Sequence, residues 1–245
     1  METDSHHKVA GADVRLLVIG DHASAYIPER LGGLGLSETD RARHIAVDIG
    51  TEDLLRGVCA RLGCPGVLAG VSRLVIDANR EPDHAGLIPT ESDGTAIAAN
   101  ADLGAQELAW RRKLYEGYHG AVARALSAAD AESGAPAMLV SLHSFTPKPL
   151  TGERRGVDVG MLAKRDEDGG DWARAERFLE ALPDRFVTGM NQPYSAYDLA
   201  YTVNRHATGQ RPQLAVEVRQ DHLGSDAGIA AFVGYVSDAI RPLIP

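Results

Sequence analysis

Four apolar stretches of the sequence contain, or lead into, side chains that can bind a metal, move a proton or hold a carboxylate. Imidazole is the commonest neutral metal ligand, carboxylates act as ligands or general bases, and arginine binds carboxylates through its planar fork. Sites in open α/β sheets lie beyond the carboxyl ends of the strands, so we expect these side chains to meet at one edge of one sheet. In chain order they are His22, the pair Asn79 and Arg80, His143, and Glu217.

His22 and His143 are the first candidates for metal ligands. A catalytic zinc takes three protein ligands and leaves one position for water, so a carboxylate is needed as the third. Asp48 is the first choice and Glu52 the second; together with His44 they are spaced four residues apart, which predicts one face of a helix. The alternatives are that the two histidines have a structural role and that the two carboxylates lie on a solvated face of the helix.

Glu217 stands inside the apolar stretch LAVEVRQ, where strand alternation places it on the same face as Arg219. A carboxylate inside an apolar strand is costly to bury without a purpose. One explanation is that Glu217 pairs with an arginine. The other is that Glu217 is a general base that activates water at a metal.

A third group is formed by Arg73, Asn79 and Arg80, which flank the short apolar stretch 74–76. Arginine binds a carboxylate through two parallel hydrogen bonds, a geometry that lysine cannot reproduce. These residues are therefore candidates for holding an acidic substrate. The alternative is a surface ion pair with a neighbouring carboxylate.

The elements that position these residues follow from hydrophobic periodicity and turn signals. Residues 1–12 are polar and predict a flexible tail, so the folded domain is expected to span residues 13–245. Strands that alternate with helices indicate one α/β domain, with a mostly parallel or mixed central sheet covered by helices on both faces. The expected strands are 15–19, 67–71, 74–76, 138–140, 157–162, 186–187 and 214–218, and the expected helices are 37–62, 105–129, 171–182 and 227–240.

Composition excludes several classes of function. The 245 residues are 44% hydrophobic and 24% charged, which is typical of a globular protein, and the net charge of −9 argues against nucleic acid or an anionic membrane as partner. There is no apolar run long enough to span a membrane and no signal-peptide pattern at the N-terminus. We therefore expect a cytoplasmic enzyme with a small-molecule substrate; the oligomeric state is left open.

Six motifs resemble, in order from about residue 16 to residue 222, those of the N-formylglutamate amidohydrolase family: GDHAS followed by IP, RHIAVDIG, SRLVIDANR, SDGTAI, SLHSFTP and AVEVRQD. The resemblance implies an α/β fold of the phosphorylase/hydrolase type, similar to zinc carboxypeptidases and aspartoacylases. It also implies zinc-dependent hydrolysis of the amide of an N-acylated acidic amino acid.

The resemblance assigns roles residue by residue. His22 and His143 match the metal histidines, Glu217 resembles the general base, and the pair Asn79 and Arg80, with Arg73 as companion, resembles the group that grips the substrate carboxylate. The wider group of zinc hydrolases has its first metal motif as His-x-x-Glu, but Ala25 stands three residues after His22. The carboxylate ligand is therefore assigned to Asp48 in RHIAVDIG.

The resulting expectation is a metal-dependent amidohydrolase that carries one zinc per chain. It cleaves N-formylglutamate, or a similar N-acyl acidic amino acid, to formate and glutamate. Zinc is held by His22, Asp48 and His143, Glu217 moves the proton, and the substrate is held by Arg73, Asn79, Arg80 and Arg219. The alternatives are a zinc hydrolase of another N-acyl amino acid or small peptide, and a carboxylate-binding protein without activity on the same fold.

Overall fold

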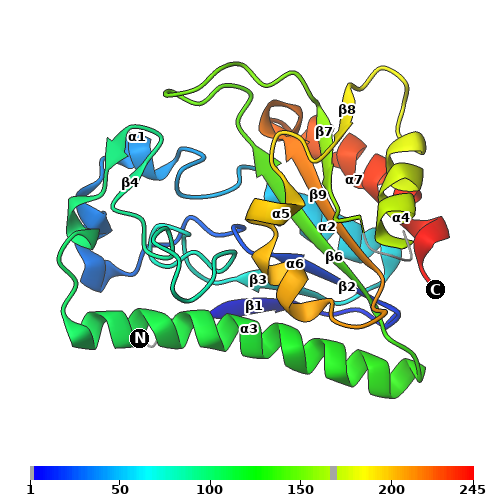
Figure 1. The fold of residues 1–245 in the computed structure, drawn as a ribbon, viewed down its shortest axis with the longest axis horizontal. Helices are drawn as coiled ribbons and strands as arrows, with labels where there is room; N and C mark the ends of the chain where they lie inside the picture. Colours follow the sequence, from blue (N-terminus) through cyan, green and yellow to red (C-terminus); the bar gives the residue numbers. More distant parts are fainter. Residues whose placement is uncertain (1–2, 166–169) are drawn as a thin grey trace.

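The computed structural model describes residues 3–165 and 170–245 and has a seven-stranded mixed sheet at its centre (Figure 1). The four central strands, β3, β2, β6 and β9, are parallel, whereas β1 and β7 run antiparallel to their inner neighbours. The predicted fold class is confirmed. In spatial order the strands are β1 (His6–Val9), β3 (Gly66–Ala69), β2 (Leu16–Gly20), β6 (Met138–Phe145), β9 (Gln213–Arg219), β7 (Val159–Leu162) and β8 (Thr188–Met190).

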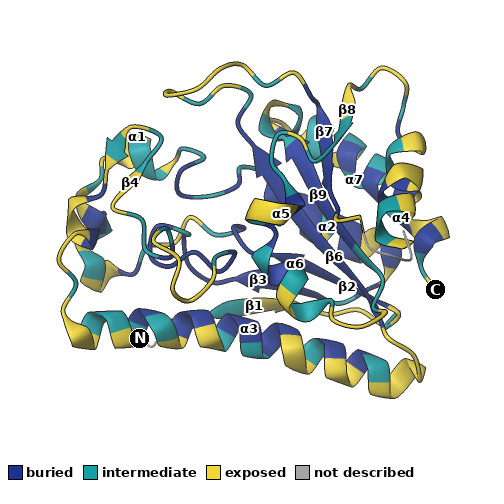
Figure 2. Cartoon of the chain, viewed as in Figure 1, coloured by how far each residue is buried: buried dark blue, intermediate teal, exposed yellow. Residues whose placement is uncertain are grey.

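Helices cover both faces of the sheet, which explains why its central strands are apolar on both sides. Alternate residues of β2 show the division: Leu16 and Val18 pack with α2 and α7, and Leu17 and Ile19 pack with α3. The strands at the centre are accordingly buried (Figure 2). The larger helices are α2 (Thr51–Leu62), α3 (Ala105–Ser133), α4 (Gly170–Glu180) and α7 (Asp226–Ile240), and the shorter ones are α1 (Glu38–Arg41), α5 (Ala196–Leu199) and α6 (Tyr201–His206).

The prediction of one continuous helix over residues 37–62 is wrong. The chain forms α1 and then α2, and the segment between them is irregular. Gly50 ends this segment with φ of 79°, a left-handed conformation that glycine adopts without steric cost. Asp48 therefore lies in the turn before α2, and it does not share a helix face with Glu52.

Two other expectations are also corrected. Residues His6–Val9 of the expected tail form β1, which pairs with β3 along its whole length; residues 1–2 of that tail lie outside the described part of the chain. Residues 74–76 are buried but form turns instead of a strand, and they pack in a separate apolar cluster with Leu34 and Ile97. Both predictions rest on the local sequence pattern, which does not show whether a partner strand is available for pairing.

The expected helices 105–129, 171–182 and 227–240 correspond to α3, α4 and α7. The predicted strand 138–140 continues to Phe145 as β6, because β9 pairs with it up to that residue. A small hairpin, β4 (Glu91–Ser92) and β5 (Thr95–Ala96), lies in the long connection before α3. None of the helices in the described residues combines the length and the apolar character that a membrane-spanning helix needs.

The turn before α2 can be tested at Gly50, where an added Cβ would lie 2.5 Å from Cβ of Leu223. We expect Gly50→Ala to lower the free energy of unfolding by about 2–4 kcal/mol, because it adds a steric clash to the cost of a left-handed φ. Gly63→Ala is the matched control, since Gly63 has φ of 70° but open space around its Cβ. Equal losses in urea denaturation of the two variants would show that the contact with Leu223 is unimportant.

Candidate active site

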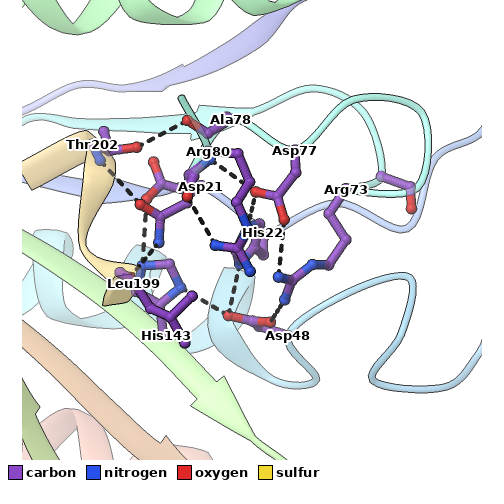
Figure 3. Close-up of polar contacts among 12 residues, drawn as sticks. Asp21, His22, Asp48, Arg73, Asp77, Ala78, Arg80, His143, Leu199 and Thr202 are labelled. Carbon is purple, nitrogen blue, oxygen red and sulfur yellow. Dashed lines mark hydrogen bonds and ion pairs between the residues drawn. The ribbon is translucent and has the colours of Figure 1, made fainter. Parts of the chain in front are cut away.

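Two parallel strands and one turn bring the candidate metal ligands together at the carboxyl edge of the sheet (Figure 3). His22 follows β2, and His143 lies near the end of the neighbouring strand β6. Asp48 is added by the turn before α2, where its backbone N–H donates to the carbonyl oxygen of His22 at 2.9 Å. The three residues are thus fixed by backbone geometry as well as by their side chains.

The side chains of the three residues converge on the carboxylate of Asp48. Its Oδ2 lies 2.9 Å from Nδ1 of His143 and 3.4 Å from Nδ1 of His22. One donor atom from each of the three residues lies within 4.8 Å of the others, and all three side chains are buried. Nδ1 of His22 is buried without a hydrogen-bond partner. A donor set of two imidazoles and one carboxylate is one that zinc accepts.

The far nitrogen of each imidazole contacts another carboxylate. Nε2 of His22 lies 2.7 Å from Oδ1 of Asp77, and Nε2 of His143 lies 3.3 Å from Oδ2 of Asp21 and 3.0 Å from Oγ of Ser141. Metal-bound histidines usually donate their second N–H to a carboxylate or carbonyl, which fixes the ring and its tautomer. The residues present therefore fit a metal held at the Nδ1 atoms.

Sequence reasoning left Asp21 open between a supporting and a structural role, and it considered Asp77 only as an ion-pair partner of the arginines. The signal was present, because Asp21 directly precedes His22 and Asp77 stands two residues before Asn79. Asp21 is in turn held by the hydroxyl of Tyr118, which donates to its Oδ1 at 2.6 Å. A residue of helix α3 thus supports Asp21, which in turn contacts the candidate ligand His143.

The pKa values of the buried groups reflect the close contacts between imidazoles and carboxylates. Burial alone would lower the pKa of both His22 and His143, but the surrounding carboxylates outweigh it and raise the pKa of each imidazole. Burial alone would raise the pKa of Asp48, yet the two imidazoles hold the pKa of this carboxyl well below its usual range. The pKa of Asp77 is lowered for the same reason, with a contribution from Arg73.

Arg73 contacts the protein's own carboxylates. Its guanidinium lies 3.3 Å from Oδ1 of Asp48 and 2.9 Å from Oδ2 of Asp77, so it bridges a candidate ligand and a supporting carboxylate. The same side chain also lines the pocket beside the ligands. Its charge is therefore largely balanced before any substrate arrives.

Glu217 lies directly opposite His143 in the register of β6 and β9, so both side chains are on the same face of the sheet. It is only 5% exposed, and its Oε2 has no hydrogen-bond partner. No arginine or lysine of the described residues forms an ion pair with it. Burial, to which the charge of Asp48 adds, raises its pKa to about 7 against the opposing effect of His143.

Asn79 and Arg80 also line the pocket, but the two side chains are used differently. The amide of Asn79 bonds to the backbone, because its Oδ1 accepts from N–H of Thr202 at 3.0 Å and its Nδ2 donates to the carbonyl of Leu199 at 3.3 Å. Arg80 donates to the carbonyl oxygen of Asn79 at 2.9 Å and forms no ion pair within the described residues. Arg80 is therefore free to bind an anion.

The structure does not bring Arg219 or Glu52 to the pocket. Arg219 lies 2.8 Å from carboxylate oxygens of both Asp158 and Asp221 at the end of β9. Glu52 is 47% exposed on α2 and pairs with Arg56. Of the two expected carboxylates, Asp48 and Glu52, the structure thus places Asp48 beside the histidines.

The pocket above these residues has a volume of about 100 Å³ and is connected to solvent. Its wall is formed by the end of β6 and by the segment that carries Tyr194 and Leu199. The lining residues to which the sequence analysis assigned neither metal, catalysis nor substrate are His44, Ser144, Phe145, Thr146, Tyr194 and Leu199. Half of these, His44, Thr146 and Tyr194, belong to loops, where no periodic pattern marks their contribution.

Solved structures of similar fold include the following two proteins. A gene product from Agrobacterium tumefaciens is 27% identical, with a TM-score of 0.88 over 98% of this chain and 96% of the other. N-formylglutamate amidohydrolase from Ralstonia eutropha is 18% identical, with a TM-score of 0.66 over the same shares of the two chains. A comparison with functionally curated proteins finds no significant match.

The family comparison covers most of the chain. Residues 14–223 match the model of the N-formylglutamate amidohydrolase family, and this range includes both histidines, Asp48 and Glu217. The chain belongs to the N-formylglutamate amidohydrolase family, whose members are hydrolases of amide bonds.

Proposed function

We propose that the protein is a zinc-dependent amidohydrolase that removes the formyl group from an N-formylated acidic amino acid such as N-formylglutamate. The products are formate and the free amino acid. The observation that carries this proposal is the placement of a buried, unpaired Glu217 opposite His143, next to a set of three candidate metal ligands. Membership of the family supports the reaction type.

His22, Asp48 and His143 would hold one zinc ion. When bound, such an ion supplies a Lewis acid that polarises a carbonyl group and lowers the pKa of water. Asp77 and Asp21 keep the two imidazoles oriented through their far nitrogens. Arg73 holds Asp48 and Asp77 in their relative positions.

Glu217 acts as general base and then as general acid. Its carboxylate accepts a proton from the water that attacks the formyl carbon, and it returns that proton to the nitrogen of the leaving amine. Without a bound metal, burial raises the pKa of Glu217 to about 7, and a zinc ion held beside it would oppose that rise and favour the carboxylate that acts as the base. The burial that raises this pKa also keeps bulk water away from the carboxylate.

The α-carboxylate of the substrate is bound by Arg80. Its guanidinium has no carboxylate partner among the described residues, and it lines the pocket beside His22 and Asn79. Asn79 positions Arg80 by anchoring this part of the chain to the backbone of Leu199 and Thr202. Arg219 is left out of the proposed substrate site because it is bound to Asp158 and Asp221.

The metal site is tested by elemental analysis of protein purified without chelators. We expect about one zinc per chain in the wild type, as for a mononuclear catalytic site, and a loss of most of it in Asp48→Asn. Glu52→Gln is the matched control, since it changes a nearby carboxylate that faces solvent. Full zinc content in Asp48→Asn would contradict the proposed ligand set.

The role of Glu217 is tested by Glu217→Gln, which preserves the shape of the side chain but cannot move a proton. We expect kcat for formate release from N-formylglutamate to fall by about 10²- to 10⁴-fold. Zinc content should equal that of the wild type, because Glu217 is not among the ligands. Turnover within a few-fold of the wild type would exclude this residue as the base.

The raised pKa of Glu217 also predicts a pH-dependent stability in metal-free protein. A carboxyl whose pKa is raised from 4.5 to about 7 stabilises the fold at low pH, and this contribution is lost as the pH rises through the folded pKa. Between about pH 5 and pH 8, the free energy of unfolding of the wild type should fall by up to ~3 kcal/mol relative to Glu217→Gln. Urea denaturation of both proteins after zinc removal measures this difference; a constant difference would mean that the carboxylate is well solvated.

A further inference from the structure

The arginines around the pocket are not equivalent. Arg73 is balanced by Asp48 and Asp77, and Arg80 is free for one carboxylate. An acidic N-acyl amino acid carries two carboxylates. A second unbalanced cation is therefore needed at the pocket, and it must come from a residue outside the sequence motifs.

Arg155 meets this requirement by its position. Its guanidinium lies 4.7 Å from the ring centre of Tyr194 and 5.6 Å from that of Phe145, and it donates to the carbonyl oxygen of Thr146 at 3.3 Å. All three of these partners line the pocket. Arg155 thus lies against the pocket wall, on the side formed by the end of β6.

The loop that carries Arg155 is held by hydrogen bonds at its base and at its far part. Its base is closed by the backbone N–H of Arg155, which donates to the carbonyl oxygen of Pro147 at 2.8 Å. Its far part is held by Asp93, whose carboxylate accepts from the backbone N–H groups of Leu150 and Thr151, each at 2.9 Å. Figure 1 shows this loop reaching from the sheet toward β4. The guanidinium is therefore presented by a fixed backbone.

The charge of Arg155 is not balanced by the protein. No carboxylate within residues 3–165 and 170–245 forms an ion pair with its guanidinium, although the side chain is partly buried. Its field reaches the pocket: burial lowers the pKa of His44 and the charge of Arg155 adds to that effect, and Arg155 also opposes the rise that burial causes in the pKa of Tyr194. A partly desolvated cation with only one hydrogen bond has capacity for an anionic ligand.

We propose that Arg155 is a specificity-determining residue that binds the side-chain carboxylate of the substrate, while Arg80 binds the α-carboxylate. The two guanidinium groups select a diacid over an N-formyl amino acid whose side chain is uncharged. The proposal rests on the proposed function, because it assigns the second half of the same substrate. Arg73 is then a positioning residue for the metal ligands.

The test compares N-formylglutamate with N-formylglutamine, which has nearly the same shape but lacks the side-chain charge. We expect Arg155→Gln to raise KM for N-formylglutamate by about tenfold or more, with kcat nearly unchanged and KM for N-formylglutamine changed less than about threefold. Arg155→Lys should recover part of the loss, since it restores the charge without the fork. Arg154→Gln is the matched control, because Arg154 is exposed and adjacent in sequence.

Two results would overturn the proposal. One is an equal loss on both substrates, and the other is an unchanged KM for N-formylglutamate in Arg155→Gln. Thermal melting of each variant separates a folding defect from a binding defect, and Arg155→Lys serves if Arg155→Gln is unstable. If the wild type cleaves neither compound, the proposed function fails. The role of Arg155 is then tested by calorimetry, which compares the binding of N-formylglutamate and N-formylglutamine to the zinc-loaded wild type and to Arg155→Gln. If neither compound binds to the wild type, the proposal for Arg155 is overturned as well.

Discussion

The carboxylate of Asp48 is the contact on which the site depends, because both imidazoles approach the same oxygen of this side chain. Two protonated imidazoles held this close repel each other, and carboxylates without a cation between them do so as well. Each imidazole lies between two carboxylates, His22 between Asp77 and Asp48 and His143 between Asp48 and Asp21, so negative side chains surround both rings. Removing one member leaves a buried charge unpaired, which is more costly than losing the contact itself.

The sheet supplies the precision of this arrangement. β2, β6 and β9 are adjacent parallel strands, so one register fixes His22, His143 and Glu217 at one edge, and both faces of these strands are covered by helices. A site built on central strands has little freedom to relax. The turn that carries Asp48 and the loop that carries Arg155 are then docked onto this rigid base through backbone hydrogen bonds.

Residues on the central strands could be predicted from the sequence, because apolar runs followed by polar side chains have one reading in a parallel sheet. Asp48 lies beside the histidines as expected, but not on a helix: a spacing of four residues fits a helix, whereas residues 42–50 are irregular and end at the left-handed Gly50. Arg219 lies on the same strand as Glu217, yet its partner Asp158, the residue before β7, is distant in the sequence and could not be predicted from the alternation of β9. Arg155 lies in a loop without periodicity, where pattern carries no information.

Asp93 has a consequence for ligand binding that extends beyond its hydrogen bonds. It lies in the turn between β4 and β5 and joins that hairpin to the loop of Arg155, and it also pairs with Arg43 and His44. Three segments that are far apart in the sequence are thereby ordered when the protein folds. Most of the conformational entropy of the Arg155 loop is lost at that stage, so an arriving carboxylate meets a preorganised cation and keeps more of its binding energy.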